Sequence, residues 1–119
     1  MNIVCLASDF STDEDVFGSG ELRMLASRND VIAIVLEDPA ETALPSGCGT
    51  IRLRDPESGR TVSVALSTRT RLAYQEAVAE RRRAIVDACY RVPIDHLFVP
   101  SDRPVMEPLL NLFARRRLA

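Results

Sequence analysis

The sequence predicts an α/β fold: a three-layer parallel sheet covered by helices, with a β-hairpin inserted between its second and third strands. Three short runs are apolar at consecutive positions, a pattern typical of parallel strands buried on both faces. Segments with helical spacing of apolar residues separate these runs, which gives the strand-helix-strand order of a parallel sheet. The chain has 119 residues, of which 46% are hydrophobic, so residues 1–119 are predicted to form a single domain.

The first predicted strand is a run of five apolar residues: Ile3, Val4, Cys5, Leu6 and Ala7. Ser11 and the acids up to Asp15 favour the start of a helix, which Gly18 and Gly20 then weaken. A firmer helix is expected over residues 21–28, and Asn29 is predicted to end it in a left-handed conformation.

The second predicted strand, residues 31–36, is apolar throughout and should lie at the centre of the sheet. Residues 50–54 and 61–65 instead alternate polar and apolar side chains, and residues 55–59 have the composition of a turn. We therefore expect a half-exposed β-hairpin over about residues 49–66, inserted into the α/β core.

A long helix is predicted from Arg69 to about Arg91, where Pro93 ends it. Its sheet-facing residues are Tyr74, Val78, Ile85 and Cys89. The third strand is expected at residues 96–99. A last helix should begin near Pro104, keep Pro108 in its first turn, and bury Val105, Leu109, Leu112 and Phe113.

Composition narrows the function classes. The net charge of −2 gives no general attraction to nucleic acid or to anionic membranes. The arginine runs at 81–83 and 115–117 have no interleaved aromatic residues, so solvated helix faces are the first interpretation, ahead of contact with an acidic protein and of nucleic-acid binding. No segment approaches the roughly 20 apolar residues of a membrane span, and no signal peptide is evident. Together with three widely spaced cysteines, this predicts a cytoplasmic protein.

Polar residues follow each predicted parallel strand, where open α/β sheets place their binding sites. Ser8 and Asp9 follow the first strand, Asp38 the second, and Asp102 the third. Three acids at neighbouring strand ends suggest an alternative function: a small phosphatase-like or flavodoxin-like enzyme that uses Asp9 as nucleophile or metal ligand. No phosphate-binding loop accompanies them, because Gly18-Ser19-Gly20 lacks the third glycine.

The other chemistry-bearing residues favour structural interpretations. His96, the only histidine, has no partner nucleophile placed by a motif, so a structural role at the start of a strand is expected. Cys48 lies between two glycines on a predicted loop, as an exposed thiol without an evident base. Cys5 and Cys89 are interpreted as small core residues.

An ordered series of segments carries a resemblance to a known family. The series is Leu6-Ala7-Ser8-Asp9-Phe10, Glu21-Leu22 with Leu25-Ala26, Asp30-Val31-Ile32-Ala33, Asp38-Pro39-Ala40-Glu41 with Leu44-Pro45, Arg52 to Gly59, Ala79-Glu80-Arg81-Arg82, and Pro108-Leu109-Leu110 with Phe113. It resembles the carboxy-terminal half of domain-of-unknown-function family 58, bacterial proteins with a von Willebrand factor A-like domain that are often encoded beside MoxR-type AAA+ ATPases. The resemblance implies the last three core strands of a doubly wound sheet.

The resemblance also implies a function. In the intact family domain, Mg²⁺ would sit on the carboxyl ends of the strands, held by a motif of three parts, and Asp9 matches only the third part. The other two parts would lie upstream of Met1, so we expect Asp9 to be a single metal ligand, insufficient alone, and this chain to carry no cofactor. The resemblance thus implies a non-enzymatic interaction module with a protein partner, a MoxR-type ATPase, at a surface of Ser8, Asp9, Ser11 and Asp38.

The same resemblance implies that the first strand has no neighbouring strand on one side in this chain. A long apolar edge with free N–H and C=O groups invites pairing with another chain. We therefore expect a homodimer through residues 3–7, and a symmetric antiparallel pair is the simplest closed arrangement.

Overall fold

The computed structural model describes residues 2–11, 14–39, 44–45, 47–54 and 58–118, without the side chains of residues 117 and 118. Its elements are β1 (Ile3–Ser8), α1 (Gly20–Arg28), β2 (Asp30–Glu37), β3 (Gly49–Arg54), β4 (Thr61–Leu66), α3 (Thr68–Arg91), β5 (Asp95–Pro100) and α4 (Met106–Leu118). Strands β1, β2 and β5 form a parallel sheet in that order, and β3 and β4 form a separate antiparallel hairpin. The α/β class, the parallel sheet and the hairpin are all confirmed.

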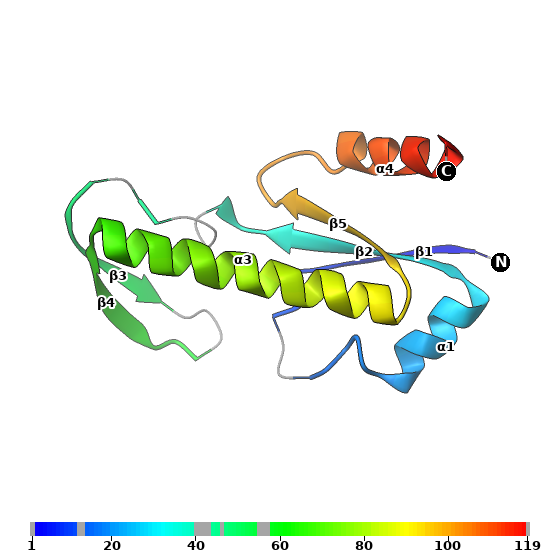
Figure 1. Ribbon diagram of the computed structural model, residues 1–119, viewed down its shortest axis with the longest axis horizontal. Helices are drawn as coiled ribbons and strands as arrows, with labels where there is room; N and C mark the ends of the chain where they lie inside the picture. Colours follow the sequence, from blue (N-terminus) through cyan, green and yellow to red (C-terminus); the bar gives the residue numbers. More distant parts are fainter. Residues whose placement is uncertain (1, 12–13, 40–43, 46, 55–57, 119) are drawn as a thin grey trace.

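Strand β2 is the centre of the core, as its composition predicts. Its residues 31–35 are buried, and helices pack on both of its faces. Ile32 and Ile34 join Val99 of β5 and Leu112 of α4 in one cluster. Ala33 and Val35 join Ile85 and Cys89 of α3 in the other cluster. The sheet therefore lies between α3 and α4, which Figure 1 shows on opposite sides of β2 and β5.

The hairpin is attached to the amino-terminal end of α3. Ser67 caps this helix by accepting a hydrogen bond from the backbone N–H of Thr70, and the Thr70 hydroxyl donates to the carbonyl of Ala65 in β4. Arg71 donates to the carbonyls of Pro45 and Gly47, just before β3. These contacts hold the hairpin at one end of the molecule, away from the parallel sheet (Figure 1). Residues 55–57 of the predicted turn lie outside the described residues.

Helix α1 starts later than Ser11 and the acids up to Asp15 suggest. Its N-cap is Ser19, whose hydroxyl accepts from the backbone N–H of Leu22, so the first helical residue is Gly20. A cap that satisfies a free N–H outweighs the low helix propensity of glycine at this end. Asn29 ends the helix in an extended conformation (φ −138°), because both its backbone N–H and its side-chain amide donate to Leu25, and the predicted left-handed ending is wrong.

Strand β1 lies at an edge of the sheet and is only partly covered. The register pairs Val4 with Val31 and Leu6 with Ala33, so Val4 and Leu6 share the α3 side of the sheet and are half-buried. Ile3, Cys5 and Ala7 point to the α4 side and are exposed, with Ile3 57% accessible. Helix α4 packs over β2 and β5, and these three residues of β1 remain exposed beside it. The expectation that Cys5 is a core residue is therefore wrong.

Glu37, the last residue of β2, is a buried carboxylate with a single arginine partner. It is 7% exposed and accepts two hydrogen bonds from Arg82 of α3, at 2.7 and 2.8 Å. The bidentate contact raises the pKa of Arg82, mainly through the hydrogen bond with Glu37. The pair joins the carboxyl end of the central strand to the middle of α3.

We expect Arg82→Met to lower the free energy of unfolding by about 1–3 kcal/mol, because it leaves a buried carboxylate without its donor. Arg83→Met is the matched control, since Arg83 is exposed and forms no ion pair among the described residues. Its effect should stay within about 0.5 kcal/mol. Urea denaturation at neutral pH measures both values, and equal losses in the two variants would contradict this role for Glu37.

Candidate functional site

The segment after β1 forms a tight, hydrogen-bonded turn around Asp9. The Ser8 hydroxyl accepts from the backbone N–H of Phe10 at 3.0 Å, and the Asp9 carboxylate accepts from the backbone N–H of Ser11 at 2.9 Å. Phe10 adopts a positive φ of 54°, which is uncommon for a bulky residue. Arg81 of α3 donates to the carbonyl of Asp9 and so fastens the turn to the helix. The side chains of Ser8 and Asp9, which are predicted to act in binding, therefore also stabilise the turn in which they lie.

Phe10 holds this turn against the core. Its ring lies 5.1 Å from the ring of Phe17, and both pack against the α3 side of the sheet, beside Ala33 and Val35. Contact between the two half-buried rings thus compensates for the unfavourable backbone conformation of Phe10. The chain then turns back through Val16 towards α1.

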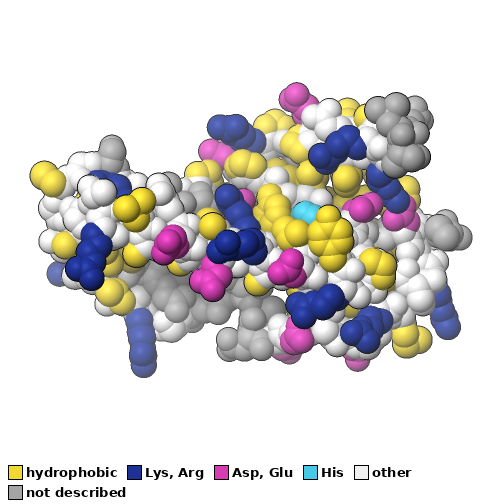
Figure 2. Space-filling model, in the orientation of Figure 1, with side chains coloured by type: hydrophobic (Ala, Val, Ile, Leu, Met, Phe, Trp, Pro, Cys, Tyr) yellow, Lys and Arg dark blue, Asp and Glu magenta, His cyan; other side chains and the backbone are white. Residues whose placement is uncertain are grey.

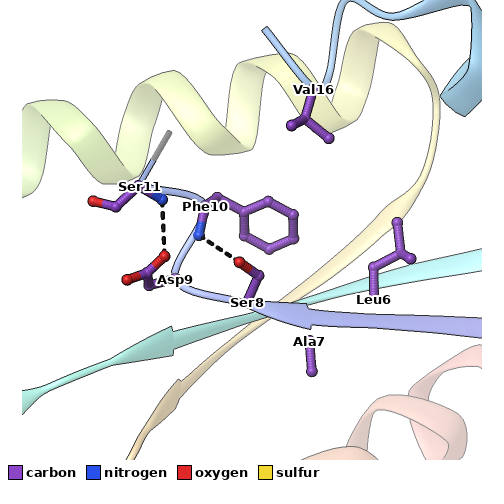
Figure 3. Close-up of a pocket in the computed structure, with 7 residues that line it drawn as sticks. All are labelled: Leu6, Ala7, Ser8, Asp9, Phe10, Ser11 and Val16. Carbon is purple, nitrogen blue, oxygen red and sulfur yellow. Dashed lines mark hydrogen bonds between the residues drawn. The ribbon is translucent and has the colours of Figure 1, made fainter. Parts of the chain in front are cut away.

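A pocket of about 280 Å³ opens where β1 ends. It is lined by Leu6, Ala7, Ser8, Asp9, Phe10, Ser11 and Val16. Figure 3 shows Leu6, Phe10 and Val16 on the side of α3, while Ala7 points to the opposite side of the strand. The pocket therefore lies along the free edge of β1, and combines apolar walls with one carboxylate and two hydroxyl groups.

The three predicted strand-end acids are not brought together. The register pairs Ser8 with Val35 and Pro100 with Glu37, so β1 ends two residues short of β2 and β5. Asp9 lies in the turn beside α3, whereas Asp38 and Asp102 follow β2 and β5, whose ends lie two positions further along the sheet. Among the described residues, no three His, Cys, Asp or Glu side chains gather as a possible metal site. Of the predicted interaction residues, Ser8, Asp9 and Ser11 line the pocket and Asp38 does not.

Other residues have structural roles. Ser19 of the Gly18-Ser19-Gly20 segment caps α1. The ring of His96 lies 5.7 Å from that of Phe98 and 6.5 Å from that of Tyr90, both in edge-to-face geometry. Figure 2 shows this histidine among hydrophobic side chains between α3 and α4. Arginines and acids are interspersed along the visible side of α3, as expected for a solvated helix face.

Two arginines from the predicted solvated runs form ion pairs with acids of the parallel sheet, which the sequence analysis did not predict. Arg82 pairs with Glu37, and Arg116 of α4 pairs with both Asp30 and Asp95, at the start of β2 and β5. The pKa of Arg116 is raised, first by its hydrogen bond with Asp30. Helical spacing could have placed Arg82 next to the sheet, because positions 78, 82, 85 and 89 share one helix face.

Residues 1–84 match the family model described as protein of unknown function DUF58. The chain belongs to the DUF58 family. The matched part includes the parallel pair β1–β2, the pocket and the hairpin, and it ends within α3. Searches of curated proteins and of solved structures found no match to this DUF58 chain. None of the described helices is both long and apolar enough to cross a membrane.

The three cysteines of the DUF58 chain differ in accessibility. Cys5 and Cys48 are exposed, and Cys89 is fully buried in the α3 cluster. Burial raises the pKa of Cys89 from 9.0 to about 11, because the thiolate would lose its hydration. In the unfolded chain this thiol ionises at its ordinary pKa.

We expect the contribution of Cys89 to stability to be constant below about pH 9 and to fall as the pH rises towards 11, because only the unfolded state loses the proton in that window. The chain contains no lysine, since all fifteen basic residues are arginine, so lysine titration does not overlap. Urea denaturation from pH 8 to about 11 measures the decline. Cys89→Ala should show a smaller decline over the same range, and an unchanged slope would refute the assignment.

Proposed function

We propose that this DUF58 chain is a non-enzymatic protein-interaction module, the carboxy-terminal part of a von Willebrand factor A-like domain that works with a MoxR-type AAA+ ATPase in the cytoplasm. The observation that carries the proposal is the open edge of β1, with an apolar pocket and an exposed carboxylate at its carboxyl end. Edge strands bind extended segments through backbone hydrogen bonds and bind their side chains in adjacent pockets.

A comparison of the two sheet edges supports this assignment. Strand β5 begins with Asp95 and ends with Pro100, and both charge and proline discourage pairing at an edge. Strand β1 contains neither a charged residue nor a proline from Ile3 to Ser8. Natural proteins rarely leave such an edge unprotected, so β1 is the edge that fits a partner.

Asp9 is suited to recognition, but the described residues do not complete a Mg²⁺ site around it. A hard cation takes about six oxygen ligands. Here one carboxylate lies beside Ser8 and Ser11, and the Ser8 hydroxyl already accepts a backbone hydrogen bond. Under the proposal, Asp9 contributes one ligand at most, and the other ligands come from outside the described residues. The von Willebrand A-like role of Asp9 is thus tested through partner binding.

The stagger of the strands argues against the alternative enzyme. A phosphatase-like or flavodoxin-like reaction at this edge would require Asp9 to act with the acids after the neighbouring strands. Asp9 is fastened to α3 through its carbonyl, and in the sheet register β1 ends two residues earlier than β2 and β5. A carboxylate in this position is better placed to meet a group that approaches from outside the sheet.

We expect Asp9→Ala to weaken binding to a MoxR-type ATPase about tenfold in the presence of Mg²⁺, which corresponds to about 1.4 kcal/mol. Asp102→Ala is the matched control, because Asp102 is also exposed after a parallel strand but does not line the pocket. Biolayer interferometry with the immobilised ATPase measures both affinities, and circular dichroism verifies that both variants fold. Wild-type affinity in Asp9→Ala would sink the assignment of this surface.

A further inference from the structure

The uncovered side of β1 matches a second copy of itself. Ile3, Cys5 and Ala7 are exposed on the α4 side, and the strand has a free edge. We infer that two copies of this chain pair through β1 in antiparallel orientation, with Cys5 of each copy opposite Cys5 of the other. The inference rests on the proposed function only in taking the β1 edge as a docking edge.

Symmetry restricts the possible registers. A two-fold axis that relates adjacent antiparallel strands is perpendicular to the sheet, so the α4 side of one copy continues as the α4 side of the other. Residues opposite each other share a face. Ile3, Cys5 and Ala7 can therefore oppose only one another, and Val4 and Leu6 likewise. The two residue numbers of every opposed pair are therefore both odd or both even.

One register keeps all five apolar residues paired. With Cys5 on the axis, Ile3 lies opposite Ala7 and Val4 lies opposite Leu6. Moving the axis to Leu6 places Ile3 opposite the carboxylate of Asp9, and moving it to Val4 leaves Ala7 beyond the paired strand. Apolar burial therefore selects the register centred on Cys5.

This register also covers the pocket. Leu6 forms part of the pocket wall on the α3 side, together with Phe10 and Val16 (Figure 3). Val4 of the second copy, opposite Leu6 on the same side, would lie against this wall. On the α4 side, the three exposed residues of each copy would form one continuous apolar stripe. Both exposed features of β1 are thus covered by one arrangement.

Charge is compatible with the arrangement. No charged residues oppose each other within the paired strands, because β1 carries none. Antiparallel pairing directs the acidic segment after one β1, with Asp9 and Asp15, towards the amino-terminal end of the other β1. Helix α1 ends there with Arg28, because Asp30, two residues later, donates its backbone N–H to the carbonyl of Asn2. Opposite charges therefore approach each other twice in the symmetric pair.

The size of the contact determines its strength. The five residues paired in this register, Ile3 to Ala7, span about 17 Å, which is short for a stable interface. The dimer should therefore be weak and depend on protein concentration. The cysteine on the axis makes it measurable, since directly opposed residues of antiparallel strands lie within disulfide range.

The experiment compares two variants that each keep one exposed thiol. Cys48→Ser retains Cys5, and Cys5→Ser retains Cys48 as a control for random collision. Cys89 stays in both variants, where burial keeps it protonated. Under mild copper–phenanthroline oxidation, we expect the Cys5 thiol to form a covalent dimer at least about tenfold faster than the Cys48 thiol, because pairing raises its effective concentration. Equal rates would overturn the register.

The register has its own test in the background Cys5→Ser, Cys48→Ser. Chains carrying Ile3→Cys, mixed with chains carrying Ala7→Cys, should form crosslinked heterodimers faster than either chain forms homodimers. Faster crosslinking in the unmixed chains would refute the register. Sedimentation of Cys5→Lys, which opposes two ammonium groups at the axis, should show a monomer at concentrations where Cys48→Lys dimerises. Dimerisation by Cys5→Lys equal to that of Cys48→Lys would also overturn it.

The outcome is separable from that of the proposed function. A wild-type chain that dimerises with the expected crosslinks and binds the ATPase at concentrations where it is monomeric supports both proposals, because the two partners use the same edge of β1. A wild-type chain that stays monomeric at every concentration but binds the ATPase refutes the pairing alone. A wild-type chain that dimerises with the expected crosslinks and does not bind the ATPase supports the pairing and refutes the proposed partner.

Discussion

The burial of β2 on both faces is the constraint on which the rest of the structure depends. Five consecutive residues of this strand are buried, and each face requires its own cover. Helix α3 supplies one cover through Ile85 and Cys89, and α4 supplies the other through Leu112. Because these helices come before and after β5, the third strand must lie beside β2, which leaves β1 at the opposite edge.

Two arginine contacts fix these covers at opposite ends of the sheet. Arg82 joins α3 to the carboxyl end of β2 at Glu37, and Arg116 joins α4 to the amino ends of β2 and β5. Apolar packing is non-directional and tolerates small shifts of a helix along the sheet. Charge-assisted hydrogen bonds are directional, so these contacts determine where each helix sits along the strands. Glu37 lies on the same face as Val35, which places its carboxylate under α3.

The sequence could predict the elements of this fold because their signals are local. Alternation identified the hairpin, helical spacing identified the buried face of α3, and continuous apolar runs identified the strands. The strand-end site was predicted less completely. Ser8, Asp9 and Ser11 do lie together at the pocket, but the stagger that separates Asp9 from Asp38 depends on the pairing register. Glu37 and Arg82 lie 45 positions apart in the sequence, and only the packed structure brings them together.

The exposure of β1 is the feature that links the sequence most directly to the proposed function. Its apolar run resembles that of β2, yet the described residues bury positions 31–35 of β2 and leave Ile3, Cys5 and Ala7 accessible. A continuous apolar strand indicates burial on both faces, whichever chain provides the cover. For β2 that cover is present in the described chain. For β1 the described residues provide less cover than the apolar run predicts, and exposed apolar area of this kind is typical of interaction sites. Because the face and the edge of β1 are both open, a partner that adds a strand would satisfy the backbone and the side chains together.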